Sequence, residues 1–164
     1  MTTHSAIAPV LTERLASSFI GLEVRTTNAL ESNMATAKIG ASWQDFFSRD
    51  MLQLIPQQVP SGKLYGLYTR FASDYRGEFS VVIGAEVFPD AMAPHGLTKV
   101  QSAASKYLVF NGTGDMPQTV LDTWQQIWAY FSDPACLYQR RYQTDFESYD
   151  GTRPNTIEIY IGVN

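Results

Sequence analysis

Apolar residues recur with the spacing of one helical face in two separate segments of the chain, at about residues 35–51 and 117–132. The second segment has clear boundary signals, since Asp115 and Pro117 suit a helix start and Pro134 favours a stop. The apolar face of the first predicted helix comprises Ile39, Trp43, Phe46, Phe47 and Met51. That of the second comprises Val120, Leu121, Trp124, Ile127, Trp128 and Phe131.

Stretches typical of β-strands flank both predicted helices. One precedes each helix and two follow it, so each half of the chain reads strand, helix, strand, strand. The expected strands are residues 19–26, 64–71 and 79–87 in the first half, and 106–110, 141–149 and 156–161 in the second. Two prolines, a glycine and few large apolar residues predict that residues 88–105 form a connecting loop.

The two halves share residues as well as element order. Trp43 and Phe47 have the same four-residue spacing as Trp124 and Trp128. The sequence Ile-Gly ends the last strand of each half. Aromatic residues also follow each helix in a similar series, which is Tyr68, Phe71 and Tyr75 in the first half and Tyr142, Phe146 and Tyr149 in the second. This pattern indicates an internal duplication.

The duplication predicts an α+β fold in which two pseudo-two-fold-related β-α-β-β units form one antiparallel sheet, with both helices on one face. Neither half alone has enough apolar surface to fold. The arrangement would leave a groove between the helices, floored by the middle strands, and such clefts are common ligand sites. We expect residues 1–164 to form a single domain, with residues 1–15 as a loosely held N-terminal arm.

Composition and charge narrow the chemistry that the chain can perform. The formal net charge is −4, which argues against direct nucleic-acid binding. The sequence has no signal peptide and no apolar run of membrane-spanning length, so a cytoplasmic location without membrane attachment is expected. Cys136 is the single cysteine and His4 and His95 are the only histidines, which argues against a disulfide, a metal site or a histidine-based triad. Phosphate-binding and dinucleotide fingerprints are also missing, so no cofactor is expected.

Several stretches of the chain resemble a known family. They are residues 64–68, 77–87, 106–110, 124–128, 146–149 and 158–161. In their order and spacing they resemble GyrI-like proteins, a family that also supplies the effector-binding domains of AraC-type and MerR-type multidrug regulators. The resemblance extends over about residues 15–163 and is strongest to free-standing members carried on integron gene cassettes, which bind cationic drugs. The chain differs from the regulators in having no DNA-binding segment, which puts transcriptional control by this chain alone in doubt.

The resemblance implies a pocket for amphipathic, often cationic, compounds with a buried glutamate and aromatic walls. The family's glutamate maps to Glu147 in the stretch Phe-Glu-Ser-Tyr. Strand alternation leaves two orientations open, because Phe146 and Glu147 point to opposite faces and only one of them can face the helices. Glu147 is therefore either a pocket residue or a solvent-exposed one.

For each aromatic candidate, a purely structural role is an alternative to lining the pocket. Trp43, Phe47, Trp124 and Trp128 are expected either to pack on the sheet, to edge the groove, or to do both. Tyr149 and the repeat-related Tyr75 either close the pocket mouth or cap the sheet, and Tyr68 belongs to the same predicted binding set.

The leading functional interpretation is a binding module for amphipathic, cationic small molecules. One alternative is a hydrolase of reactive small molecules, with Glu147 as general base assisted by Tyr149 or Tyr75. Another is a protein-interaction role such as gyrase inhibition, which would involve a protein partner; a homodimer also stays open.

Overall fold

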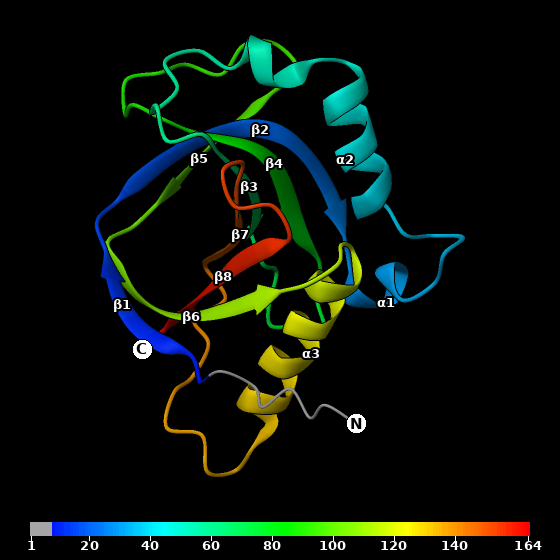
Figure 1. Ribbon diagram of the computed structural model, residues 1–164, viewed down its shortest axis with the longest axis vertical. Coiled ribbons are helices and arrows are strands. Elements are labelled where there is room, and N and C mark those ends of the chain that lie inside the picture. Colours follow the sequence, from blue (N-terminus) through cyan, green and yellow to red (C-terminus); the bar gives the residue numbers. More distant parts are fainter. Residues whose placement is uncertain (1–7) are drawn as a thin grey trace.

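In the computed structural model, which describes residues 8–164, eight antiparallel strands form one strongly curled sheet, visible as a ring in Figure 1. Their order across the sheet is β1-β6-β8-β7-β3-β4-β2-β5. The strands are β1 (Val10–Arg14), β2 (Ser17–Thr26), β3 (Lys63–Thr69), β4 (Phe79–Val87), β5 (Thr98–Ser102), β6 (Ser105–Thr113), β7 (Thr144–Asp150) and β8 (Thr156–Val163).

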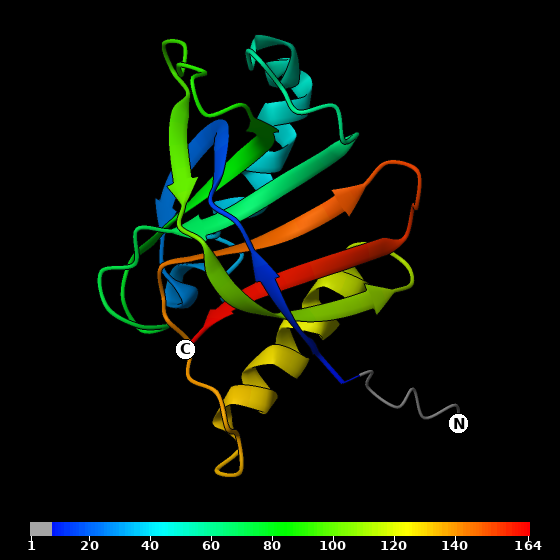
Figure 2. The ribbon, with the colours of Figure 1, turned by 90° about the vertical axis from the view of Figure 1, so that its left-hand side faces the viewer.

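The duplicated arrangement predicted from the sequence is confirmed. The first unit is β2, α2 (Ile39–Ser48), β3 and β4, and the second is β6, α3 (Gln118–Ser132), β7 and β8. The two units join where β3 pairs with β7 at the middle of the sheet. Figures 1 and 2 show α2 and α3 on the same, outer side of the curled sheet. No helix within residues 8–164 is long and apolar enough to span a membrane.

The sheet closes on itself through two bent strands. β1 runs into β2 after Arg14, and β5 runs into β6 after Ser102. The two bent strands pair on both sides of the bend, Val10–Arg14 with Ser105–Val109 and Ser17–Gly21 with Thr98–Ser102. The register does not shift across the bend, because Arg14 faces Ser105 on one side of it and Ser17 faces Ser102 on the other. The ladder between β1–β2 and β5–β6 therefore completes a ring, which leaves few free strand edges.

Two expectations about these segments are corrected. Residues 10–14 of the expected N-terminal arm form β1, and residues 98–102 of the expected loop form β5. Residues 1–7 of that arm lie outside the described part of the chain. Both strands are only five residues long and carry few large apolar side chains, so their alternation is too short to predict strands. Their backbone hydrogen bonds, rather than side-chain burial, place them in the sheet.

The curl gives the sheet two buried faces. The concave face is filled by side chains of the sheet itself, including Phe19, Tyr65, Leu67, Tyr107 and Phe146. The convex face packs against α2 through a cluster that contains Phe46 and Ile83, and against α3 through one that contains Ile127, Ile159 and Ile161. Consecutive residues of a strand are therefore buried on opposite faces, as in β4, where eight of nine residues are buried.

The first helical segment is shorter than the sequence pattern predicts. α2 ends at Ser48, and a separate 3₁₀ helix, η1 (Met51–Leu54), follows Asp50, whose φ of 49° is left-handed. A short helix that the sequence did not predict, α1 (Asn28–Glu31), precedes α2. The Glu31 carboxylate accepts hydrogen bonds from the backbone N–H groups of Lys38 (2.8 Å) and Ile39 (3.0 Å), which stabilises the start of α2.

Candidate functional site

Glu147 lies near the middle of the sheet, on β7, and is only 2% exposed. Its strand lies between β3 and β8, where Gly66 and Ile159 are its direct neighbours in the ladders. The side chain is on the convex face, which the helices cover. Of the two orientations that the sequence left open, the solvent-exposed one is therefore excluded. The prediction failed to foresee that Phe146 is buried as well, on the concave face of the curl.

Three hydrogen-bond donors from three elements hold the carboxylate. Oε2 accepts from the Tyr68 hydroxyl on β3 (2.8 Å) and from the Trp124 indole N–H on α3 (2.7 Å). Oε1 accepts from the Tyr149 hydroxyl on β7 (2.8 Å). Because each donor comes from a different element, the position of the carboxylate depends on the packing of α3 against the central strands.

The electrostatic setting of Glu147 is unusual for a glutamate. Burial raises its pKa above the ordinary value, while the hydrogen bonds from Trp124, Tyr149 and Tyr68 lower the pKa and oppose that shift. Burial and the nearby carboxylate raise the pKa values of Tyr68 and Tyr149 well above the usual range, so both phenols stay protonated and act as donors. Within residues 8–164, no lysine or arginine forms an ion pair with Glu147.

The absence of a side chain at Gly66 leaves room beside the carboxylate. A Cβ at this position would lie 3.2 Å from Oε1 of Glu147 and 3.2 Å from Cζ2 of the Trp43 ring. Trp43, on α2, also makes an edge-to-face contact with Tyr149, with the ring centroids 5.4 Å apart. The carboxylate therefore lies between an aromatic wall from α2 and another from α3, where Trp124 packs against Tyr68 at 5.0 Å.

Two further predicted residues extend these walls towards solvent. Phe47 stacks on Trp43 with a centroid separation of 6.0 Å, and Trp128 packs against Trp124 at 6.2 Å. Phe47 is 56% and Trp128 is 46% exposed, so of the alternatives that the helical pattern left open, neither residue is packed fully against the sheet. Both lie on flanks of their helices that the sheet does not cover.

Tyr75 does not take part in the contacts around Glu147. It is 52% exposed in the segment between β3 and β4. Its ring lies under the Arg76 guanidinium at 5.5 Å, and its carbonyl accepts from the Asn28 side chain. Tyr75 and Tyr149 occupy equivalent positions in the sequence repeat, but only Tyr149 contacts the carboxylate of Glu147.

A second buried carboxylate on β7, which the sequence analysis missed, is Asp145. It accepts from the Arg140 guanidinium (Nη2 to Oδ2, 2.9 Å) and from the Gly162 N–H (2.8 Å), and its exposed fraction is 0%. The Arg140 guanidinium lies over the Tyr142 ring at 4.4 Å and near Phe131 at 6.0 Å. The spacing of two between Asp145 and Glu147, which puts both on one strand face, was the available signal.

The described residues do not bring together a metal or histidine site. Within residues 8–164, no group of three histidine, cysteine, aspartate or glutamate side chains could hold a metal ion. His95 is exposed in the segment before β5, and His4 lies outside the described residues. The chemistry available at Glu147 is that of a buried carboxylate, two phenols and indole rings, which can receive a positive charge between aromatic surfaces.

Comparison with known proteins places the chain in a family. The family model described as "Cass2: Integron-associated effector binding protein" matches residues 11–163. The chain belongs to the Cass2 family. The description of this family as integron-associated and effector-binding agrees with the sequence resemblance to GyrI-like and integron-cassette proteins.

Two relatives resemble the chain in sequence, and a third protein shares its fold. The putative transcriptional regulator protein YobU of Bacillus subtilis is 30% identical over 150 residues, which cover 88% of this chain and 91% of YobU. The crystal structure of the Vibrio cholerae integron cassette protein VCH_CASS2 is 37% identical and has a TM-score of 0.78, covering 96% of both chains. The structure of SAV2435 bound to tetraphenylphosphonium shares the fold, with a TM-score of 0.71 at 19% identity over 96% of this chain and 94% of SAV2435.

Proposed function

We propose that this protein binds amphipathic organic cations between α2 and α3, with Glu147 as the counter-charge and the surrounding aromatic rings as walls. The observation that carries the proposal is a buried carboxylate, on the face between two helices, which has hydrogen-bond donors but no cationic partner among residues 8–164. The wall residues are Trp43, Phe47, Tyr68, Trp124, Trp128 and Tyr149.

The desolvation cost of the buried Glu147 carboxylate favours binding of a cation over binding of a neutral compound. An ionised carboxylate is costly to bury unless it is paired, and hydrogen bonds from neutral groups offset only part of that cost. A bound cation would supply the missing charge, whereas a neutral compound of the same shape would not. Cation selectivity therefore follows from the burial of the carboxylate.

The Asp145–Arg140 ion pair is an example, within this protein, of a buried β7 carboxylate paired with a cation next to an aromatic ring. Asp145 lies on the same face of the same strand as Glu147, and the cation that compensates it is the Arg140 guanidinium, packed over Tyr142. Glu147 has the carboxylate and the aromatic neighbours of that arrangement, but no guanidinium. We infer that a ligand takes the place at Glu147 that Arg140 takes at Asp145.

The aromatic walls favour broad rather than narrow selectivity. A cation over a Trp or Tyr ring gains about 0.5 to 2 kcal/mol, without a directional hydrogen bond. Charge pairing and ring contact both tolerate changes in ligand shape. SAV2435, which shares this fold, has been seen with the lipophilic cation tetraphenylphosphonium, which supports a ligand of this class.

The test compares tetraphenylphosphonium with neutral triphenylphosphine oxide. The chain has 3 tryptophans, all assigned to the proposed walls, so intrinsic tryptophan fluorescence reports on this region. We expect the cation to bind and the neutral compound to bind at least tenfold more weakly, a difference of about 1.4 kcal/mol or more. Glu147→Gln should remove that preference.

Glu147→Gln is a conservative choice here. Its amide oxygen can still accept from Tyr68 and Trp124, and its NH₂ group can donate to the Tyr149 hydroxyl, which would reverse one hydrogen bond. Glu158→Gln, on the concave-face side of β8, is the matched control and should bind like the parent. Equal affinity for the two compounds in the parent protein, or unchanged cation binding by Glu147→Gln, would refute the proposal.

A further inference from the structure

We propose that a second binding site, for a small oxyanion such as a phosphate or carboxylate group, lies at the corner where the ring of strands bends. It is independent of the proposed cation site, because it opens on the other side of β7. Thr144 lines it, and Thr144 alternates with Asp145 and so faces away from the helices that cover Glu147.

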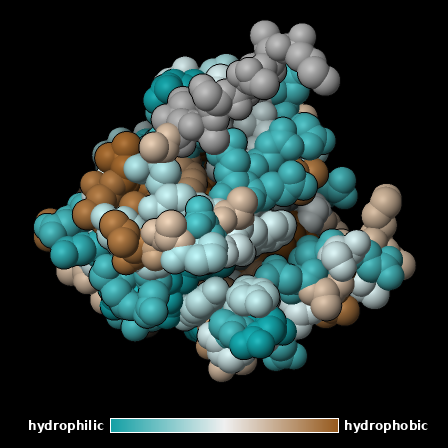
Figure 3. Space-filling view, turned by 90° about the horizontal axis from the view of Figure 1, so that it is seen from below, coloured by the Kyte–Doolittle hydropathy of each residue, from teal (hydrophilic) through white to brown (hydrophobic). Residues whose placement is uncertain are grey.

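A polar cavity of about 130 Å³ occupies this corner, between the end of β5, the start of β6 and the segment that precedes β7. Its lining is mostly polar. The donor-bearing side chains are Gln101, Ser105, Tyr107, Arg141, Gln143 and Thr144. A second, larger hollow adjoins it, shares Ser105 and Arg141, and is bordered by Arg14 and Lys106. Figure 3, which views the whole molecule from below, shows a largely hydrophilic surface interrupted by hydrophobic areas.

Arg141 is the central cationic group of the cavity. Its guanidinium donates to the Ser105 hydroxyl and to the Gln143 side-chain oxygen, the latter at 2.7 Å. Both acceptors are neutral, and within residues 8–164 Arg141 forms no ion pair. A guanidinium binds carboxylates and phosphates more strongly than neutral acceptors, so an oxyanion entering the cavity would compete well for it.

Two more positive groups lie close by. The Arg14 guanidinium lies over the Phe146 ring at 4.9 Å and the Tyr160 ring at 5.3 Å, and it has no carboxylate partner among the described residues. Lys106 borders the adjoining hollow, where it faces Glu13 across the ladder. Glu13 offsets one of these charges, so the side chains that line the two hollows keep a positive excess.

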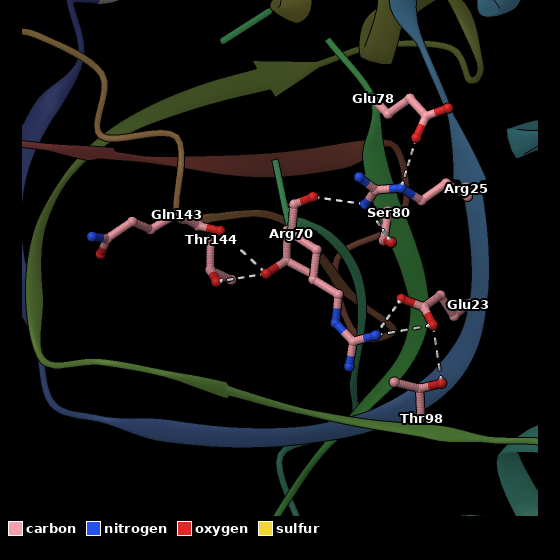
Figure 4. Close-up of polar contacts among 9 residues, drawn as sticks. Glu23, Arg25, Arg70, Glu78, Ser80, Thr98, Gln143 and Thr144 are labelled. Carbon is pink, nitrogen blue, oxygen red and sulfur yellow. Dashed lines mark hydrogen bonds and ion pairs between the residues drawn. The ribbon is translucent and has the colours of Figure 1, made fainter. Parts of the chain in front are cut away.

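At the opposite end of the same concave face, the arginines are paired with glutamates. There Arg70 pairs with Glu23 at 3.1 Å, and Arg25 pairs with Glu78 at 3.4 Å. Figure 4 shows both pairs, with Thr98 donating to Glu23. The unpaired guanidinium groups are therefore concentrated at the cavity end of the face.

Tyr107 supplies a hydroxyl donor to the same place. Its side chain is buried, and burial together with the charge of Asp145 raises its pKa, while Arg14 and Arg141 lower it. Both guanidinium groups therefore lie close enough to Tyr107, a lining residue of the cavity, to lower the pKa of its hydroxyl. An oxyanion held by Arg141 would find Tyr107 as a further donor, whereas the Thr144 hydroxyl already donates to that of Thr69 (3.0 Å), which itself donates to the Gln143 carbonyl.

The experiment is isothermal titration calorimetry with inorganic phosphate and with acetate, at constant ionic strength maintained with sodium chloride. Constant ionic strength matters because exposed charges are screened by salt. We expect saturable binding of at least one oxyanion, with acetate and phosphate distinguishing a carboxylate from a phosphate site. Arg141→Met should weaken that binding at least tenfold.

Arg49→Met, at the exposed end of α2, removes the same charge elsewhere and should leave binding unchanged. Ala103→Glu, at an exposed position in the cavity lining, places a carboxylate beside Arg141 and should abolish binding without disturbing the core. Retained tryptophan fluorescence would show that each variant is folded. The proposal is overturned if neither oxyanion binds, or if Arg49→Met and Arg141→Met weaken binding equally.

Discussion

At the scale of single residues, β7 presents two buried carboxylates two positions apart with different partners. Asp145 has the Arg140 guanidinium and the Gly162 N–H, and Glu147 has three neutral donors. Burial raises the pKa of both, but only Asp145 has a cation to oppose that shift. Among residues 8–164, Glu147 therefore lacks the cationic partner that Asp145 has, and this difference is the basis of the proposed cation site.

The raised pKa of Glu147 has a consequence for stability. Between its unfolded-state pKa and its higher folded-state pKa, the folded protein binds more protons than the unfolded one, so this group's contribution to stability falls as pH rises. Glu147→Gln removes the titration, so its free energy of unfolding should improve relative to the parent as pH rises above the ordinary glutamate pKa of 4.5.

Urea unfolding of both proteins at a series of pH values between about 4 and 8 measures this difference. Glu158→Gln should follow the parent curve. A Glu147→Gln variant whose stability relative to the parent does not change with pH would show that the pKa of Glu147 is not raised.

At the scale of elements, β3 provides two of the residues that surround the Glu147 carboxylate. Tyr68 supplies a donor, and Gly66 leaves the space that Glu147 and the Trp43 ring share. The same strand pairs with β7, so the two halves of the duplication meet at the candidate site. The site is therefore a property of the junction between halves, and neither half could form it alone.

Gly66→Ala tests this view of the junction. The added Cβ would lie 3.2 Å from both Oε1 of Glu147 and Cζ2 of Trp43, so these two side chains have to shift by a few tenths of an ångström. We expect a loss of about 1 to 3 kcal/mol in stability, as for other overpacked positions, together with altered tryptophan emission and weaker tetraphenylphosphonium binding.

Gly40→Ala on α2 is the matched control, because a Cβ there meets no atom within 4 Å. It should keep binding intact and leave stability unchanged or raise it by up to about 1 kcal/mol. Equal behaviour of the two variants in denaturation and binding would contradict the assigned crowding at Gly66.

At the scale of the whole molecule, ring closure by the bent strands shapes the protein. β1 and β5 stand at the two ends of the strand order. Because β1 continues into β2 and β5 continues into β6, the pairing of β1 with β6 and of β5 with β2 closes the sheet into a ring. Val10 is 56% and Leu11 is 44% exposed, so β1 contributes mainly hydrogen bonds and cover for the neighbouring strand. The concave aromatic face and the proposed oxyanion site both depend on this closure.

A chain that begins at Ser17 would test the role of closure. It lacks β1 and leaves the β6 edge, from Ser105 to Val109, unpaired. We expect a loss of about 2 to 5 kcal/mol from the missing hydrogen bonds, and association through the exposed edge. Urea unfolding and size-exclusion chromatography measure these effects. A chain that begins at Ala8 keeps β1 and is the control; if the two chains are equally stable and monomeric, β1 does not close the sheet.

The sequence by itself determined the duplicated β-α-β-β plan, the positions of both long helices and most residues around Glu147. These features follow from local periodicity, which records which residues share a face of one element. The pairing of Trp43 and Phe47 with Trp124 and Trp128 was enough to relate the two halves, and the family resemblance selected Glu147. Periodicity could not choose between packing on the sheet and edging the groove for Phe47 and Trp128, which are both partly exposed on flanks that the sheet leaves uncovered.

Only the tertiary structure decided what covers each face. The curl buries both faces of the central strands, so alternation along β7 could not tell the orientation of Phe146 from that of Glu147. β1 and β5 are strands because distant backbone groups pair with them, and Arg140 reaches Asp145 because the chain after α3 returns to β8. These contacts join residues far apart in the chain or across a bend, and local spacing carries no information about such partners.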